Sequence, residues 1–186
     1  WNIDFPHLML RAKAARFKKD GASMRDKVLS ATDTVGKLAG IPVIVDVVNA
    51  TNRSKIGRKL LESTLGIHRN APVPQYHSNT ARKRLSHLKN SDGAAASPGK
   101  KTRGKVALYL TCYGNRNHPV INEDLVAVFE HNGIPLLLVE KEVYCGMPKL
   151  ELGDLDAIAR AKEVNVPELA RLVDEGWDLT APIPSC

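Results

Sequence analysis

The sequence has few cysteines and few aromatic residues, and it lacks a long apolar run. Its 186 residues include 3 Cys, 3 Phe, 2 Trp and 4 Tyr. Three cysteines, none of them in a Cys-x-x-Cys pair, are too few for the disulfide framework of a small secreted domain. The longest apolar run, residues 41–48, contains Asp46 and is too short to cross a bilayer. The first residues do not form a signal-peptide pattern, so we expect a cytoplasmic protein.

Acidic residues are scarce in the first part of the chain. Residues 1–104 carry 20 Lys and Arg against 7 Asp and Glu, whereas residues 105–186 carry 7 against 13. This asymmetry indicates either two segments with different partners or a basic arm for nucleic acid, a membrane surface or an acidic protein. The basic residues are not interleaved with aromatic residues and form no recognised nucleic-acid motif, so nucleic acid is the least favoured partner.

The first half of the chain predicts helices. Residues 8–19 form a basic helical pattern, and a second helix is expected from the cap Ser23 toward Lys37. Residues 43–48 are compatible with a buried helix or a strand. Residues 54–65 predict a short helix that ends at Gly66. We assign residues 1–88 to a basic, mainly helical segment, and residues 89–104, rich in Gly, Ala, Ser, Pro and Lys, to a flexible linker.

The second half alternates between strands and helices. Strands are expected at residues 105–115, 134–146 and 178–186, and helices at residues 121–133 and 153–177, the latter as one helix or as two divided near Pro167. This order predicts an α/β fold with a doubly wound parallel sheet at residues 105–186.

The three cysteines each follow one of these predicted strands. Cys112, Cys145 and Cys186 are separated by one strand-plus-helix unit each. Because the carboxyl ends of parallel strands lie at one edge of the sheet, where ligands bind, we expect the three thiols to converge. Converging thiolates suit zinc or an iron–sulfur centre. Two alternatives are that the cysteines are buried apolar residues, and that Cys112 is a nucleophile paired with His118.

The stretches TCYGN, VEKEVYCGMPKLELGD and APIPSC, in this order, resemble the cysteine-rich CCG domain. This domain occurs in heterodisulfide reductases, in the C subunit of anaerobic glycerol-3-phosphate dehydrogenase and in related iron–sulfur oxidoreductases. The stretches WNIDFPHLMLRAKA and IPVIVDVVNATNRSKIGRKLLESTLGIH resemble the segment that follows a ferredoxin-like domain in some of these proteins. The resemblance covers most of the chain outside the linker.

The resemblance implies that Cys112, Cys145 and Cys186 ligate an iron–sulfur cluster of the [4Fe–4S] type. Gly114 and Gly146 would lie in the turns next to the cofactor, where a glycine permits positive φ or a close approach of the backbone. Two positions depart from the family pattern, because Tyr144 and Ile183 stand where the family has further cysteines. Three thiols could hold such a cluster with one open or non-cysteine position.

The resemblance further implies an iron–sulfur electron-transfer subunit of a respiratory or heterodisulfide-reductase-like oxidoreductase. It would pass electrons between a flavin-containing dehydrogenase and a quinone or thiol acceptor, with the basic helix at residues 8–19 docked on a partner subunit or on the inner face of the membrane. The alternative, motivated by Tyr144 and Ile183, is a binding or scaffold domain with a degenerate cluster site. We also expect both ends of the chain to be internal points of a longer protein.

Overall fold

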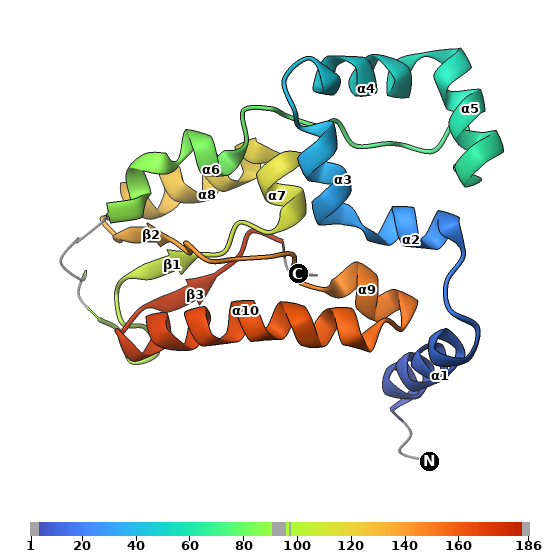
Figure 1. Cartoon of the computed structure of the whole chain (residues 1–186). Coiled ribbons are helices and arrows are strands. Elements are labelled where there is room, and N and C mark those ends of the chain that lie inside the picture. Colours follow the sequence, from blue (N-terminus) through green and yellow to red (C-terminus); the bar gives the residue numbers. More distant parts are fainter. Residues whose placement is uncertain (1–3, 91–95, 97, 184–186) are drawn as a thin grey trace.

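A three-stranded parallel sheet lies at the centre of the computed structural model, which describes residues 4–90, 96 and 98–183 (Figure 1). The strands are β1 (Val106–Leu108), β2 (Leu136–Leu138) and β3 (Asp178–Thr180), in the order β2-β1-β3. Helix α8 (Pro119–His131) connects β1 to β2 on one face, and α10 (Leu155–Asp174) connects β2 to β3 on the other. The predicted doubly wound α/β arrangement is therefore confirmed.

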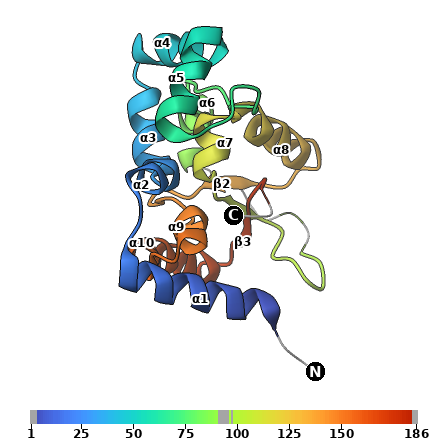
Figure 2. The same cartoon turned by 90° about the vertical axis from the view of Figure 1, so that its right-hand side faces the viewer.

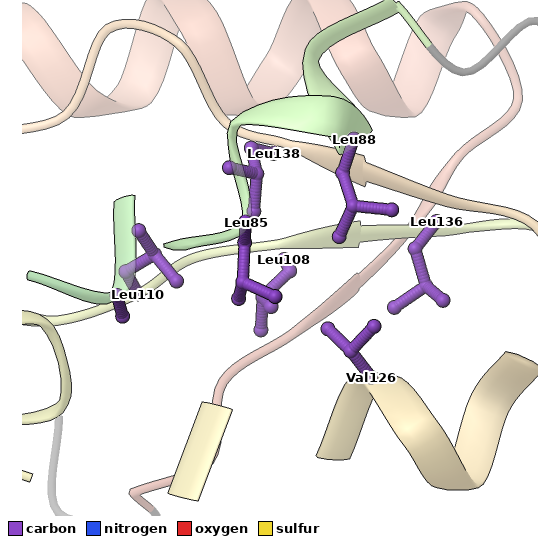
Figure 3. Close-up of a cluster of buried hydrophobic side chains, with 8 residues drawn as sticks. Leu85, Leu88, Leu108, Leu110, Val126, Leu136 and Leu138 are labelled. Atoms are coloured by element: carbon purple, nitrogen blue, oxygen red, sulfur yellow. The ribbon is translucent and has the colours of Figure 1, made fainter. Parts of the chain in front are cut away.

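Each face of the sheet has its own apolar core, because successive side chains along a strand point to opposite faces. Figure 3 shows the core beneath α8, which also receives side chains from residues 81–88. Its buried members are Ala81, Leu85, Leu88, Leu108, Leu110, Val126, Leu136 and Leu138. The core beneath α10 contains Ala107, Val139, Leu172 and Trp177. Full burial of a leucine contributes about 1.5–3 kcal/mol, so these alternating leucines stabilise the strands.

The strands are shorter than the sequence predicts. Leu110 is buried, but the ladder of β1 already ends at Leu108, and Cys112 begins the short helix α7 (Cys112–Arg116). Residues 139–146 after β2 are also irregular up to α9 (Met147–Leu152). The apolar run of β1 continues past the strand to buried Leu110, and that of β2 continues only to buried Val139, before the exposed residues 140 and 141. An apolar run therefore reports burial rather than strand length.

Helix α10 is continuous across Pro167. A proline inside a helix removes one backbone hydrogen bond, which favours a break when nothing else holds the helix. In this helix Ala157, Ala161 and Leu172 are buried on both sides of the proline. Tertiary packing thus keeps the two halves in one helix, and the division considered from the sequence does not occur.

The described residues 4–65 form five helices: α1 (Phe5–Asp20), α2 (Met24–Ser30), α3 (Thr32–Ala39), α4 (Ile44–Arg53) and α5 (Lys55–Leu65). The predicted helix at residues 8–19 and the helix capped by Ser54 and ended by Gly66 are confirmed. Of residues 43–48, all but the first belong to α4, so this stretch is a helix and not a strand. Figure 2 shows α1 beside α9, at the opposite end of the molecule from α4 and α5.

The single helix expected from Ser23 to Lys37 is wrong, since two helices meet at Ala31. The cap itself is as predicted, because the Asp26 amide donates to Ser23 Oγ at 3.1 Å. The break coincides with contacts on either side of it: the Lys149 ammonium donates to Ser30 Oγ at 3.1 Å, and Thr32 reaches Cys112. Contacts with the α/β unit therefore outweigh the local preference for one helix.

Residues 77–104 join the helices to the sheet. They include α6 (Ala81–Arg84) and the 3-10 helix η1 (Ser86–Asn90). Part of the expected linker, residues 91–95 and 97, lies outside the described residues. Near its end, Thr102 Oγ1 and the Arg103 amide donate to Asp178 Oδ2 at 2.5 and 2.7 Å, which ties this segment to β3.

Candidate metal centre

Cys112 occupies the first position of α7, immediately after Thr111. Thr111 is buried and has φ 61° and ψ 159°, a region that residues other than glycine rarely adopt. Its hydroxyl accepts a hydrogen bond from the Gly114 amide at 3.1 Å, which caps the helix. Such strain costs of order 1–3 kcal/mol and persists only where the surroundings enforce it. The backbone before Cys112 is therefore held in one unusual conformation.

The Cys112 thiol is partly buried and donates to Thr32 Oγ1 at 3.6 Å. Burial is the main cause that raises the pKa of this thiol, and the Cys145 thiolate raises it further, while the hydrogen bond with Thr32 opposes the rise. The protonated thiol is thus favoured in the metal-free protein, and a metal would have to displace its proton.

A polar cavity of about 120 Å³ adjoins Cys112. Its wall includes Tyr144, Glu142 and the cationic residues Lys37, Arg82 and Arg116. Two of these cations are paired, Lys37 with Asp33 at 2.6 Å and Arg82 with Glu142 at 2.6 Å. The wall therefore carries three cationic and two anionic side chains, and its two ion pairs largely balance its charge.

Cys145 lies on the other side of the same sheet edge, in the irregular segment before α9. Its neighbour Gly146 has φ 91°, and a Cβ atom added there would lie 2.9 Å from Ile158 Cδ1. The thiol lines a cavity of about 400 Å³ together with Tyr109, Lys162 and Asn165. Cys112 and Cys145 therefore face two different cavities, although they interact electrostatically.

A hydrogen-bond network fixes the segment that carries Cys145. The Glu142 carboxylate accepts from the Leu110 amide at 3.1 Å, and Arg82 also donates to the Val139 carbonyl at 2.8 Å. Burial is the main cause that raises the pKa of Glu142, against the lowering effect of Arg82. The ion pair joins α6 to the carboxyl edge of the sheet and positions residues 139–142 above β1.

Tyr109 and Asn165 hold the next two residues of that segment. The Tyr109 hydroxyl donates to the Val143 carbonyl at 2.5 Å, and the Val143 amide donates to Asn165 Oδ1 at 2.9 Å. Asn165 Nδ2 donates to the Tyr144 carbonyl at 3.3 Å. The sequence did not reveal these residues, because an asparagine inside a helix and a tyrosine just after a strand carry no signal of their distant partners.

Tyr144 points toward α10, and its hydroxyl donates to the Ala157 carbonyl at 3.3 Å. At the position where the family pattern has a further cysteine, this chain thus has a side chain that joins two elements. Gly114 differs from Gly146, since its φ is not positive. A Cβ atom on Gly114 would lie 2.7 Å from Asn122 Nδ2. Asn122 is fully buried, and its side chain has no hydrogen-bond partner among the described residues.

Cys112 and Cys145 both follow the carboxyl ends of neighbouring strands, but they line different cavities. Cys186 lies outside the described residues, as do Pro184 and Ser185. Within the described residues, no three His, Cys, Asp or Glu side chains are grouped so that they could hold a metal ion. A [4Fe–4S] cluster held by protein thiolates uses four cysteines, so the described donors alone do not form a complete cluster site. The assignment of Cys112, Cys145, Cys186, Gly114 and Gly146 to a cofactor stays a prediction.

The alternative Cys–His pair receives no structural support from the described residues. The His118 backbone amide donates to the Tyr113 carbonyl at 3.0 Å, and His118 precedes α8. No hydrogen bond between its imidazole and a thiol occurs in the part of the chain that the structure describes. A general base needs to lie within hydrogen-bond reach of its nucleophile.

Across the described ranges, no single helix has the length and apolar character that crossing a membrane requires. Helices α3 and α4 satisfy both criteria only when taken together, and they are bent by 107° relative to each other. Helix α1 has no buried residue, and its Lys13 forms an ion pair with Glu151 of α9.

The chain is similar to curated proteins over its whole length. It is 27% identical over 186 residues to the C subunit of anaerobic glycerol-3-phosphate dehydrogenase from Escherichia coli strain K12, and equally to its counterpart from Escherichia coli O157:H7. The chain spans 44% of the length of these relatives. No family model and no solved structure matches the chain. The similarity supports the resemblance to this dehydrogenase subunit, while the likeness to the CCG domain and to heterodisulfide reductase rests on the sequence motifs alone.

Proposed function

We propose that the chain is part of an electron-transfer subunit of an oxidoreductase, with Cys112, Cys145 and Cys186 as ligands of an iron–sulfur cluster. The similarity to the dehydrogenase subunit over the full chain carries this proposal. The positions of Cys112 and Cys145, which follow the carboxyl ends of the neighbouring parallel strands β1 and β2, support it. A cluster there would accept and release single electrons, at a potential set by its thiolates and by hydrogen bonds to sulfur.

The electrons would come from a flavin-containing dehydrogenase partner. Oxidation of a reduced flavin releases two electrons and two protons, and reduction of a quinone to a quinol, or of a disulfide to two thiols, takes up the same number. The chain's own residues contribute at two points. Thr111 and its cap hold Cys112, and the network of Glu142, Tyr109 and Asn165 holds the segment that carries Cys145.

Iron and sulfide analysis with EPR, on anaerobically purified or reconstituted protein, tests the proposal. We expect iron in the wild type, its loss in Cys112→Ser and Cys145→Ser, and a more stably bound cluster in Tyr144→Cys, which adds a fourth thiol. The absence of iron above background in both the wild type and Tyr144→Cys would overturn the proposal.

A second candidate is a scaffold domain with a degenerate cluster site. It is favoured by the absence of a three-ligand group among the described residues and by the Tyr144 hydroxyl, which already bonds to Ala157. On this alternative, neither the wild type nor the variants Cys112→Ser and Cys145→Ser bind iron. Both variants retain folding and partner assembly. A large loss of stability in either variant would contradict it.

A further inference from the structure

A large apolar cavity lies between two walls of the helical segment. One wall comes from α2, α3 and α7, and the other comes from α4, α5 and the residues that follow α5 (Figure 1). The volume of the cavity is about 620 Å³. Several lining side chains remain open to solvent, including Leu38 at 59%. The two walls therefore enclose a space instead of packing against each other.

The wall formed by α4 and α5 is a single body, residues 44–71, which its own contacts hold together. Buried Arg58 on α5 donates to three backbone carbonyls of residues 68–71 at 2.6–2.9 Å. Helix α5 packs closely on the end of α4, since a Cβ atom on Gly57 would lie 2.2 Å from the Thr51 carbonyl oxygen. These contacts are internal to residues 44–71, so they persist if this body moves as a whole.

The opposite wall is anchored on the α/β unit. The Gln75 carbonyl accepts a hydrogen bond from Asn117 Nδ2, just beyond α7, at 2.9 Å. The His77 amide donates to the Arg116 carbonyl at 2.9 Å. Residues 75–77 therefore belong to the fixed part of the molecule, and the mobile body ends before them.

Two short connections join residues 44–71 to the fixed part. One is residues 72–74, which make no hydrogen bond with the residues that the structure describes. The other ends at Val43, which has φ 73° and ψ −48°. A β-branched residue rarely adopts positive φ, and such strain persists only where the surroundings enforce it. The side chain of Val43 is 76% exposed, so its own packing does not enforce this conformation.

Hydrogen bonds between the two walls hold the strained position. Asn49 of α4 exchanges two hydrogen bonds with the backbone of Tyr76, at 2.9 and 3.0 Å. At the far end of α5, Arg25 Nε of α2 donates to the Leu65 carbonyl at 2.5 Å. Once these bonds break, φ of Val43 is free to relax from 73° to the ordinary helical value of about −63°. A rotation of this size turns α4 away from α3 and separates the two walls.

We propose that residues 44–71 form a hinged lid, which the bonds of Asn49 and Arg25 latch over the apolar cavity and which the strained Val43 biases toward opening. Because the lining is already partly exposed, opening exposes less additional apolar surface than parting a packed core. The lid controls access to the cavity, including its end at Thr32, the hydrogen-bond partner of Cys112. Its motion requires no cluster, so it is independent of the electron-transfer function.

Pulsed EPR distance measurements on the full chain test the proposal. Spin labels are attached through ketone-bearing amino acids at positions 56 and 128, so that the native cysteines remain unmodified. Ile56 on α5 is 83% exposed and belongs to the lid, and Val128 on α8 is 59% exposed and belongs to the fixed part. We expect one dominant distance in the wild type and a second distance, from the open lid, that gains population when the latch is broken.

Asn49→Ala removes two latch bonds and is expected to raise the ratio of open to closed lid by about tenfold or more. Asn52→Ala is the matched control and should leave the ratio unchanged. Asn52 is in the same helix and lines the same cavity, but its side chain makes no hydrogen bond with the described residues. Circular dichroism checks folding, and Arg25→Met, which breaks the other latch, replaces Asn49→Ala if that variant does not fold.

Val43→Asn tests the hinge in the background of the broken latch, where the open lid is populated. Asparagine tolerates positive φ better than valine, so it relieves the strain of the closed lid and should lower the open-to-closed ratio by about five- to tenfold. Val47→Asn is the matched control, because Val47 is also exposed on α4 but does not have positive φ. It should leave the ratio unchanged.

Stopped-flow binding of Nile red, a neutral apolar dye, measures access to the cavity. The rate should rise in the latch variant and fall again when Val43→Asn is added. A single distance in both latch variants, an effect of Asn52→Ala equal to that of Asn49→Ala, or equal effects of Val47→Asn and Val43→Asn would overturn the proposal. Equal dye-binding rates in all variants would overturn the role of the lid in access.

Discussion

Gly146 is the residue next to Cys145 whose conformation restricts substitution most directly. Its φ of 91° disfavours any L side chain, and an added Cβ would meet Ile158 at 2.9 Å. We predict that Gly146→Ala lowers the free energy of unfolding by about 1–3 kcal/mol, from backbone strain together with the contact. Urea denaturation measures this loss.

Gly133→Ala separates the two causes. Gly133 also has positive φ, 67°, but nothing lies within 4 Å of its added Cβ. Gly133→Ala should lower the free energy of unfolding only by the contribution of backbone strain, about 1–2 kcal/mol. Equal losses in both variants would mean that Ile158 moves aside without cost, and a stable Gly146→Ala would contradict the strain itself.

The residues of the candidate site differ in how far the sequence reveals them. The positive φ of Gly146 was predictable, because a glycine after an expected strand end is typical of a turn. The positive φ of Thr111 was not, since threonine normally avoids this region and only the tertiary structure enforces it. Asn122 and Asn165 lie in helices whose pattern gives no hint of what their amides face.

At the scale of elements, the order of strands and helices was predictable, but several of their ends were not. Short apolar runs located β1 and β2, and helical patterns located α8 and α10. Tyr109, Glu142 and Asn165 tie the irregular segments after β1 and β2 into the structure through long-range hydrogen bonds. Such contacts shortened the expected strands and kept α10 whole across Pro167.

The attachment of β3 to the segment before β1 should depend on pH. Hydrogen bonds from Thr102 and then from the Arg103 amide hold the pKa of Asp178 below its ordinary value. A carboxyl group whose pKa is lowered by folding stabilises the protein above its unfolded pKa of about 3.9. This contribution is fully present at neutral pH and is lost as the pH falls below about 4.

We predict that Asp178→Asn reduces stability at neutral pH and flattens the decline of the unfolding free energy below pH of about 4, measured by urea denaturation at a series of pH values. Asp124→Asn on α8 is the control, because Asp124 is exposed and makes no side-chain hydrogen bond or ion pair with the residues the structure describes. If the unfolding free energy declines equally with falling pH in the wild type and in Asp178→Asn, the bonds to Thr102 and Arg103 do not stabilise the ionised carboxylate.

At the scale of the whole molecule, some of the unevenly distributed charges pair with each other within the chain. Basic residues of the first part pair with acidic residues of the second: Lys13 with Glu151, Arg82 with Glu142, and Arg84 with Glu123. The exposed pair of Lys13 and Glu151 contributes roughly 0–1 kcal/mol, so it orients α1 more than it stabilises it, whereas Glu142 in the pair with Arg82 is largely buried. The sequence showed the two charge blocks but could not show that they face each other, because the pairs depend on how the helices dock on the sheet.

Helix α3 docks on α7 at Gly36, and this contact joins the helical part of the molecule to the candidate metal centre. Gly36 is buried, and an added Cβ would lie 2.6 Å from Arg116 Cδ. The neighbouring His77 amide donates to the Arg116 carbonyl at 2.9 Å. We predict that Gly36→Leu lowers the free energy of unfolding by about 1–3 kcal/mol, because a larger side chain pushes α3 away from α7. Helix propensity favours leucine over glycine by about 1 kcal/mol, so a net loss reports the contact itself.

The matched control is Thr34→Leu, on the exposed side of the same helix, which should change stability by less than about 0.5 kcal/mol. Amide hydrogen exchange provides a local readout. In Gly36→Leu the His77 amide should exchange faster, while amides in the core of the sheet, such as that of Val106, keep their protection relative to global unfolding. If Gly36→Leu is as stable as Thr34→Leu and His77 remains protected, α3 does not depend on close packing against α7 at Gly36.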